Sequence, residues 1–272
     1  MNSTRAIFLD IDGTYATHGV VPPAHEEAVR AARAVGNLVL LCTGRPVSAI
    51  PESLTRAGFD GIVGAAGAYV TIAGKTLSDV RFPAELAAKT VAALTKHGML
   101  YILETPDGLY ARAGAAGLID QARRAYAGND DSAQSRSTSI TEAINLQSIS
   151  FAKAVCLGGD TPIDEVAREI GPEVAVVPTS IQDLGPSAGE IYQAHMTKAV
   201  GMRVVMDELG VDVSNVFAFG DGLNDLEMLK FAGTAVAIEG SDPRLLAVAD
   251  RTAKGPHEAG LAQAFAELGL LD

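Results

Sequence analysis

Short apolar runs alternate with helical patterns along the first part of the chain. Apolar stretches of strand length are followed by segments in which apolar residues recur every three or four positions. This alternation is typical of a parallel sheet whose strands are joined by crossover helices. The predicted strands are 6–9, 38–42 and 62–63, the predicted helices are 24–35 and 48–57, and a hairpin-like pair follows at 68–72 and 76–80.

The same pattern returns near the C-terminus. Helices are predicted at 198–209 and from about residue 225, and strands are predicted at 216–219 and 235–238. The strands and helices of the two ends therefore have the pattern expected for parts of one α/β sheet with crossover helices.

Between Pro83 and Gly189 the pattern changes to an α+β mixture. The predicted helices are 84–97 and 163–170, the predicted strands are 100–104, 151–157 and 174–177, and the polar tract 128–138 predicts a loop. We therefore expect two domains: a discontinuous α/β core of residues 1–82 and 190–272, and an inserted domain of residues 83–189. The two connections between such domains can act as a hinge.

Composition and charge fit this interpretation and narrow the function. The length of 272 residues exceeds a typical single core of about 100–200 residues. Hydrophobic residues make up 48% and charged residues 20%, which allows a substantial buried core. The 33 acidic and 21 basic residues leave a net charge of −12, which argues against a nucleic-acid or anionic membrane partner.

The cysteines and the N-terminal residues bear on the cellular compartment. Cys42 and Cys156 lie far apart and neither belongs to a CxxC motif, so neither a zinc site nor a disulfide framework is predicted. The first apolar run, 6–9, is too short for a signal-peptide core or a membrane span. We expect a cytoplasmic protein that is a monomer or a homodimer.

Two carboxylates follow the first predicted strand. Asp10 and Asp12 are two residues apart in the segment FLDIDGT, so their side chains point to the same side of an extended chain. Gly13 permits a tight turn directly after them. Carboxylates this close repel each other unless a cation or a shared proton lies between them. The pair therefore indicates a bound metal or one raised pKa.

Two further strands end in polar residues at the same predicted edge of the sheet. Thr43-Gly44-Arg45 follows the second strand, and GDGLND at 220–225 follows a strand near the C-terminus. Open α/β sheets bind ligands at this carboxyl edge. Asp221 and Asp225 add hard oxygen ligands, which suit Mg²⁺, although Asn224 or Asp225 can equally be the N-cap of the helix that follows.

These motifs strongly resemble those of the haloacid dehalogenase superfamily, and within it the Cof-type, subfamily IIB phosphatases. The matching motifs are DxDGT at 10–14, a strand followed by Thr-Gly-Arg at 43–45, an isolated Lys198 that opens a helix, and GDGxND at 220–225. They occur in the order and spacing of the family, and the resemblance covers nearly the whole chain. It implies a Rossmann-like α/β core with a parallel sheet and an inserted α+β cap domain that acts as a lid.

The resemblance also implies a role for each motif residue. Asp10 would be the nucleophile that forms an aspartyl-phosphate, and Asp12 would protonate the leaving alcohol and then activate water. Mg²⁺ would be held by Asp10, the Asp12 backbone carbonyl and Asp221, with Asp225 behind it. The residues that would bind the substrate or its phosphate group are Thr43, Gly44, Arg45, Lys198 and Asn224.

The expected function is a Mg²⁺-dependent phosphatase that acts on a small phosphorylated metabolite, such as a sugar phosphate. Two alternatives stay open. A phosphotransferase or phosphomutase would pass the phosphate to a second acceptor instead of water, and a phosphometabolite-binding regulator would keep the fold without turnover. The intact set Asp10, Asp12, Lys198 and Asp221 argues against the regulator, because a binding protein needs neither a nucleophile nor a proton shuttle.

Two tripeptides depart from the family pattern. Ala66-Gly67-Ala68 stands where Asn-Gly-Ala is frequent, and Glu239-Gly240-Ser241 stands where Gly-Asn-Ala is frequent. Both positions border the substrate pocket in family members, so they weaken any inference about the substrate. Neither departure touches the residues of phosphoryl transfer.

Other motifs in the sequence are rejected. AGKT at 73–76 lacks the glycine that a Walker A loop needs five residues before Gly74. GPSAG at 185–189 lacks the strand-to-helix context of a nucleophile elbow. The five histidines form no zinc motif, and we expect surface or capping roles for them, although His195 could reach the pocket because it precedes Lys198 by three residues.

Overall fold

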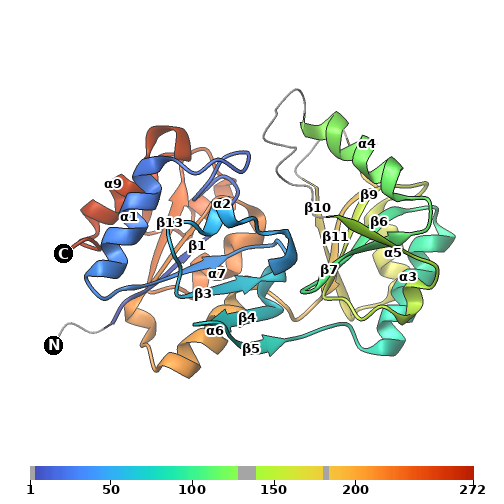
Figure 1. Ribbon diagram of the computed structural model, residues 1–272, viewed down its shortest axis with the longest axis horizontal. Coiled ribbons are helices and arrows are strands. Elements are labelled where there is room, and N and C mark those ends of the chain that lie inside the picture. The colour runs from blue at the N-terminus through green and yellow to red at the C-terminus, as the bar shows by residue number, and fades with distance from the viewer. Residues whose placement is uncertain (1–3, 128–138, 180–183) are drawn as a thin grey trace. The chain divides into compact units, whose positions relative to one another are not determined.

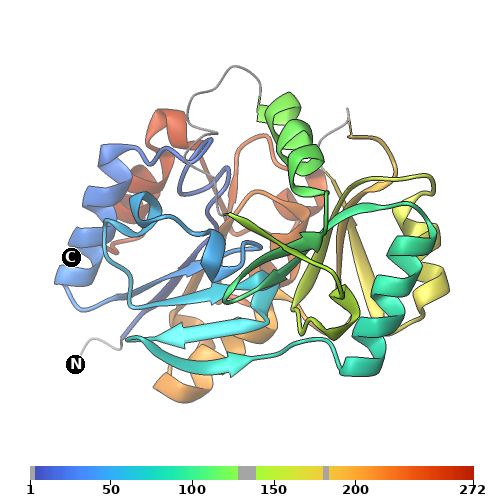
Figure 2. The same cartoon turned by 45° about the vertical axis from the view of Figure 1, so that its right-hand side comes forward.

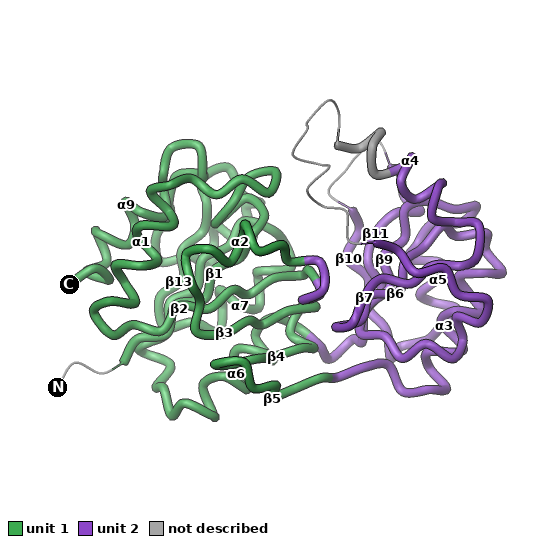
Figure 3. Tube along the Cα trace, in the orientation of Figure 1, with its two compact units in different colours: residues 1–45, 50–79, 197–272 green, residues 46–49, 80–196 purple. Residues whose placement is uncertain are grey.

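The computed structural model describes residues 4–127, 139–179 and 184–272. These residues form two compact units, which Figure 3 shows in different colours. Unit 1 comprises Met1–Arg45, Ile50–Asp79 and Thr197–Asp272, and unit 2 comprises Pro46–Ala49 and Val80–Met196. The polar tract 128–138, for which the sequence predicts a loop, lies outside the described residues.

Unit 1 contains an eight-stranded sheet with the order β14-β13-β12-β1-β2-β3-β4-β5. The strands from β14 to β3 are parallel, and the hairpin strands β4 and β5 are antiparallel additions at one edge. The sheet consists of β1 (Ala6–Leu9), β2 (Leu38–Cys42), β3 (Gly61–Gly64), β4 (Tyr69–Ile72), β5 (Lys75–Asp79), β12 (Val216–Gly220), β13 (Thr234–Ile238) and β14 (Arg251–Ala253).

Helices cover both faces of this sheet (Figures 1 and 2). The helices of unit 1 are α1 (Pro23–Ala34), α2 (Glu52–Thr55), α6 (Lys198–Leu209), α7 (Leu226–Phe231), α8 (Pro243–Leu246) and α9 (Gly260–Glu267). Helices α1 and α9 share one apolar cluster with alternate strand residues such as Ile7, Leu9 and Leu41. Helices α6 and α7 share the other cluster with the intervening residues, such as Phe8 and Leu40. Burial on both faces explains why these strands are continuous apolar runs.

Unit 2 contains a six-stranded sheet with the order β10-β11-β9-β6-β7-β8. Its neighbouring strands are antiparallel except for the parallel pair of β7 and β8. Helices α3 and α5 share an apolar cluster with Leu103, Cys156 and Ile191 of the sheet. The elements of unit 2 are α3 (Ala84–Lys96), β6 (Leu100–Thr105), β7 (Gly108–Arg112), α4 (Ala116–Ala127), β8 (Ile140–Ala143), β9 (Lys153–Gly158), α5 (Ile163–Ile170), β10 (Val174–Pro178) and β11 (Ala188–Gln193).

The α/β class, the parallel core sheet and the insertion of an α+β module are confirmed, but several details differ, among them six elements that the pattern did not predict: β7, α4, β8, α8, β14 and α9. The helix predicted at 48–57 is only a turn at Val47–Ala49 and the four-residue α2, because Pro51 between them lacks the amide donor of a continuous helix. The domain break expected after Gly189 falls inside β11, which pairs with β9 and β10 of unit 2. Residues 190–196 therefore belong to unit 2 rather than to the core, and so do residues 46–49 and 80–82, which were also expected in the core.

Of the surface or capping roles expected for the histidines, His25 does not have the surface one: it is fully buried in the core of unit 1. Its Nδ1 lies 2.9 Å from the carbonyl oxygen of Tyr15, and its Nε2 accepts a hydrogen bond from the backbone amide of Leu261 at 3.2 Å. Leu261 is in the first turn of α9, so the imidazole caps this helix from inside the core.

None of the described helices is long and apolar enough to cross a membrane.

Candidate active site

The ends of three adjacent parallel strands carry the candidate residues of unit 1. Strand β1 lies between β12 and β2, with Leu9 opposite both Phe219 and Leu41. Asp10 follows β1, and its backbone amide donates to the carbonyl of Phe219 at 3.0 Å. Residues that follow these strands therefore meet at one edge of the sheet, although up to about two hundred residues separate them in the sequence.

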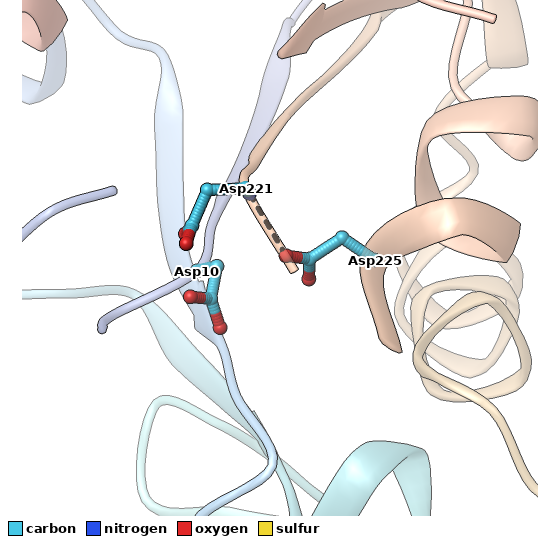
Figure 4. Close-up of side chains that lie close together, drawn as sticks. All are labelled: Asp10, Asp221 and Asp225. Atoms are coloured by element: carbon cyan, nitrogen blue, oxygen red, sulfur yellow. Dashed lines mark hydrogen bonds between the residues drawn. The ribbon is translucent and has the colours of Figure 1, made fainter. Parts of the chain in front are cut away.

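Three carboxylates gather at this edge. Asp10, Asp221 and Asp225 each place one oxygen within 4.8 Å of the others, and Figure 4 shows their side chains. Lys198, the first residue of α6, is fully buried beside them. Its Nζ donates to Oδ1 of Asp10 and to Oδ1 of Asp225, each at 2.5 Å. The lysine therefore joins the end of β1 to the start of α7.

Burial and charge perturb the acids of this group. Burial raises the pKa of Asp10 well above its usual value, against the attraction of the Lys198 ammonium. Burial also raises the pKa of Asp221 to about 6, although a hydrogen bond from Thr14 acts in the opposite direction. Burial opposes the charge of Lys198, but Asp10 and Asp225 outweigh it and raise the lysine pKa. The lysine is thus a fixed positive charge at this edge.

Asp225 supports the site rather than facing it. Its side chain is fully buried, and its Oδ1 accepts from Lys198. Its Oδ2 accepts from the backbone amides of Asp221 at 3.0 Å and Gly222 at 2.9 Å. Both oxygens of Asp225 are thus engaged in holding the lysine and the loop after β12. Asp10 and Asp221 are therefore better placed to be direct ligands of a cation.

Thr14, to which the motif comparison assigned no role, contacts the three-carboxylate group. It is buried, and its hydroxyl donates to Oδ1 of Asp221 at 2.7 Å. Gly13 precedes it with a φ of 96°, and a β-carbon at Gly13 would overlap the Asp221 carboxylate. The Gly-Thr pair of the DxDGT motif was the available signal. Its meaning depends on Asp221, which lies 207 residues from Thr14.

Thr43 is buried directly after β2. Its hydroxyl oxygen accepts from the backbone amide of Arg45 at 3.1 Å, which leaves the hydroxyl proton free to be donated to a ligand. Its backbone carbonyl accepts from the amide of Ala66 at 3.1 Å. Ala65 and Ala66 have φ values of 48° and 55°, which alanine rarely adopts. This left-handed turn therefore supports the loop that carries Thr43.

Gly67 continues this turn and reaches the start of α6. Its φ is 104°, and a β-carbon there would overlap the carbonyl of Thr197, the residue before Lys198. The tripeptide Ala66-Gly67-Ala68, which departs from the family pattern, thus packs beside the residue that presents the buried lysine. Glycine is required here both for its backbone conformation and for the close approach.

The remaining predicted site residues are not members of the three-carboxylate group. The Asp12 side chain is 47% exposed, and both of its oxygens accept from Arg45. Asn224 lies in a turn at Leu223–Asp225, with its side-chain oxygen close to Gly222. Gly44 is partly buried between Thr43 and Arg45. His195, which could have reached the pocket, is an exposed residue of unit 2.

The group of carboxylates fits a divalent metal ion. Asp10, Asp221 and Asp225 carry three negative charges when ionised, and Lys198 supplies one positive charge, so two negative charges are in excess. Buried carboxylates with such an excess need a cation or protons between them. Carboxylate oxygens are also the donors that hard divalent cations prefer. The residues present therefore suit a hard divalent cation.

Two bacterial relatives are similar to this chain over 98% of its length. A protein of Bacillus subtilis, YxeH, provisionally named a phosphatase, is 25% identical over 98% of both chains. A Streptococcus pyogenes protein, provisionally named a bifunctional phosphatase and peptidyl-prolyl cis-trans isomerase, is 27% identical over 98% of this chain. The present chain spans 54% of that relative's length.

Two solved structures share the fold over nearly the whole chain. A protein from Geobacillus kaustophilus without a stated function is 26% identical, with a TM-score of 0.82 and coverage of 98% of this chain and 100% of its own. A haloacid dehalogenase subclass IIB sugar phosphatase is 21% identical, with a TM-score of 0.80 and the same coverage. The likeness to this second structure shows a shared fold, and the assignment to subfamily IIB stays a prediction from the motifs.

The family model of haloacid dehalogenase-like hydrolases matches residues 7–265, which includes every candidate residue at the carboxyl edge of the sheet. The chain therefore belongs to the family of haloacid dehalogenase-like hydrolases.

Proposed function

We propose that this chain is a Mg²⁺-dependent phosphatase that hydrolyses a small phosphorylated metabolite through an aspartyl-phosphate on Asp10. The observation that carries the proposal is the arrangement around Asp10. One of its carboxylate oxygens is held by the buried Lys198, and Asp221 lies beside it with an oxygen within 4.8 Å. A carboxylate fixed between a permanent cation and a metal-binding acid has the surroundings that a nucleophile towards phosphorus needs.

In the first step, an oxygen of Asp10 attacks the phosphorus atom of the substrate. The bond from phosphorus to the ester oxygen breaks, and Asp12 gives a proton to the leaving alcohol. Lys198 keeps its positive charge next to the attacking carboxylate and the transferring group. The hydroxyl proton of Thr43 is available to a phosphate oxygen. Phosphoryl transfer depends mainly on such positioning and neutralisation of charge.

In the second step, Asp12 takes a proton from a water molecule, and the water oxygen attacks the phosphorus of the aspartyl-phosphate. The bond between phosphorus and the Asp10 oxygen breaks, which releases inorganic phosphate and restores the carboxylate. Asp12 is suited to both steps because its side chain is about half exposed and meets solvent. The two steps divide one difficult hydrolysis into two easier transfers.

The metal would be held by Asp10, Asp221 and the backbone carbonyl of Asp12, with Asp225 behind them. When bound, Mg²⁺ neutralises charge that develops on the phosphoryl oxygens. The Thr14 hydroxyl fixes the Asp221 carboxylate for this role at 2.7 Å. Asp225 fixes the backbone of Asp221 through its amide at 3.0 Å.

A sugar phosphate or a related phosphomonoester is the substrate class that we propose. Its support is the name of the sugar phosphatase that shares this fold, together with the net charge of −12, which does not favour large polyanionic partners. We propose that residues of unit 2, the predicted cap, select the metabolite, and we assign this role to the unit as a whole.

The test measures inorganic phosphate released from p-nitrophenyl phosphate and from a panel of phosphorylated sugars. We expect Mg²⁺-dependent release that EDTA abolishes and added Mg²⁺ restores. Asp10→Asn should abolish release, and acid quenching of the wild type with labelled substrate should trap a label that hydroxylamine removes. Asp60→Asn, at the opposite edge of the sheet, is the matched control and should retain turnover. Phosphate release by Asp10→Asn at a rate comparable with that of the wild type would show that Asp10 is not the nucleophile.

A calorimetric titration with Mg²⁺ measures metal binding separately from catalytic turnover. Binding should be lost in Asp221→Asn and kept in Asn224→Ala. Metal binding that persists unchanged in Asp221→Asn would contradict the ligand set.

A further inference from the structure

Arg45 and Asp12 form a two-pronged ion pair beside the three-carboxylate group. Nε of Arg45 donates to Oδ2 of Asp12 at 2.7 Å, and Nη2 donates to Oδ1 at 2.6 Å. The Arg45 side chain is 17% exposed and the Asp12 side chain is 47% exposed. Such a planar fork fixes the orientation of a carboxylate as well as its charge.

The backbone of Arg45 is itself held on both sides. Its amide donates to the hydroxyl oxygen of Thr43 at 3.1 Å, and its carbonyl accepts from the amide of Ala65 at 2.8 Å. Asp12 is tied to Ala16 by an isolated parallel bridge. Because β1 and β2 are neighbours in register, the two residues that follow these strands come within reach of each other. The fork therefore joins two supported loops.

The fork leaves Asp12 able to exchange a proton. A carboxylate has about four lone-pair positions, and the two hydrogen bonds from Arg45 use one on each oxygen. Each oxygen keeps a position for water or for a leaving group. Without the fork, a side chain that is about half exposed would sample several rotamers in water. Arg45 thus removes rotational freedom from Asp12 without consuming its acceptors.

We propose that Arg45 is a positioning residue that holds the Asp12 carboxylate in place for proton transfer, rather than a ligand of the substrate phosphate. This role rests on the proposed function, in which Asp12 exchanges protons in both steps. The edge of the Arg45 guanidinium that carries Nε and one N–H of Nη2 is occupied by Asp12, and the other N–H bonds lie on Nη1 and Nη2. In this role, the effect of Arg45 on turnover passes through Asp12.

A double-mutant cycle tests this dependence. The variants are Arg45→Ala, Asp12→Ala and the double variant, and p-nitrophenyl phosphate is the substrate because its leaving group needs little protonation. Rapid quenching measures p-nitrophenolate and inorganic phosphate separately. Misplacing a group that transfers protons costs about ten- to a hundredfold in rate. We expect Arg45→Ala to lower kcat at least tenfold with KM changed less than about twofold, and to change kcat less than twofold in the Asp12→Ala background.

Two more variants separate orientation from charge and from folding. Arg45→Lys keeps the positive charge and loses the fork, so it should recover little of the lost kcat. Arg33 forms the same kind of fork on Asp60, at 3.0 Å and 2.8 Å, at the opposite edge of the sheet. Arg33→Ala should lower thermal stability and leave kcat unchanged. The thermal midpoint of Arg45→Ala should stay near that of the wild type, so that its loss of kcat is not a folding defect.

The outcomes are distinct. A raised KM with unchanged kcat, or the same loss from Arg45→Ala in both backgrounds, would overturn the positioning role and indicate direct phosphate binding. Full recovery by Arg45→Lys would also overturn it. A wild type without any phosphate release would overturn the proposed function, and this role with it. Turnover with additive losses would overturn this role alone.

Discussion

The two units each bury a lysine between two carboxylates, but the surroundings of the two lysines differ. In unit 1, Lys198 contacts Asp10 and Asp225, and a third acid, Asp221, lies in the same group. In unit 2, Lys153 contacts Glu104 at 3.2 Å and Glu190 at 2.9 Å. Both lysines are almost completely buried, and in both the burial that opposes the charge is outweighed by the carboxylates, which raise the pKa.

The acids of the two groups come from different kinds of structure. Lys153 and Glu104 are paired residues of neighbouring strands, and Glu190 lies on the next strand, so side chains across one sheet make the contacts. Around Lys198, the acids follow two strand ends and begin a helix, where loops and backbone amides converge. Two negative charges are in excess there, against one around Lys153. A buried ion pair alone therefore does not mark a site; an excess of ligands at strand ends does.

Within the comparison of the two lysines, the largest effect should come from removing Lys198. Lys198→Met deletes the fixed charge beside Asp10, and we expect kcat for p-nitrophenyl phosphate to fall about 10²- to 10³-fold, as for loss of a preorganised electrostatic contact. Lys153→Met is the matched control and should stay within about threefold of wild type. A Lys198→Met variant within tenfold of wild type would break the distinction between the two lysines.

Removing Lys153 should instead lower stability. Lys153→Met leaves Glu104 and Glu190 without the buried ammonium that they share, and we expect the free energy of unfolding to fall by about 3–5 kcal/mol. Urea unfolding followed by circular dichroism measures the change. Lys96 pairs with Glu169 on the surface of the same unit, and Lys96→Met should change stability by less than about 1 kcal/mol. Equal losses of unfolding free energy from Lys153→Met and Lys96→Met would show that burial of an ion pair adds nothing to its effect on stability.

His25 sharpens the comparison because it is a buried base with only neutral partners. Burial lowers the pKa of His25, although its bond to the Tyr15 carbonyl acts in the opposite direction. The unfolded chain therefore binds a proton at His25 at a higher pH than the folded chain does. The contribution of the neutral His25 to the free energy of unfolding is fully present above the unfolded pKa of about 6.5, and it is lost as the pH falls towards the folded pKa.

The measurement is the free energy of unfolding against pH. Below pH 6.5 we expect a fall of at most about 1.4 kcal/mol per pH unit from this group. His25→Gln should remove that component, whereas His257→Gln, which changes an exposed histidine, should keep it. An unchanged slope in His25→Gln would mean that another group titrates.

The sequence by itself determined most elements and the positions of the reactive motifs. Apolar periodicity located β1, β2, α1, α6 and the hairpin within a residue or two, because it reports which face of each element is buried. It also placed Asp10 and Asp221 directly after strands. The same local signal could not decide that 190–193 pair with β9, because a strand of alternating residues fits either sheet.

Only the tertiary structure decided which side chains meet. The bond from Thr14 to Asp221 spans 207 residues, and the bond from Lys198 to Asp10 spans 188. Arg45 donates to both oxygens of Asp12, a contact that no motif indicated, and Asp225 supports Lys198 and the loop after β12. These contacts depend on which strands are neighbours and on the depth at which each residue is buried. Local periodicity carries information on neither, because both arise when distant segments pack together.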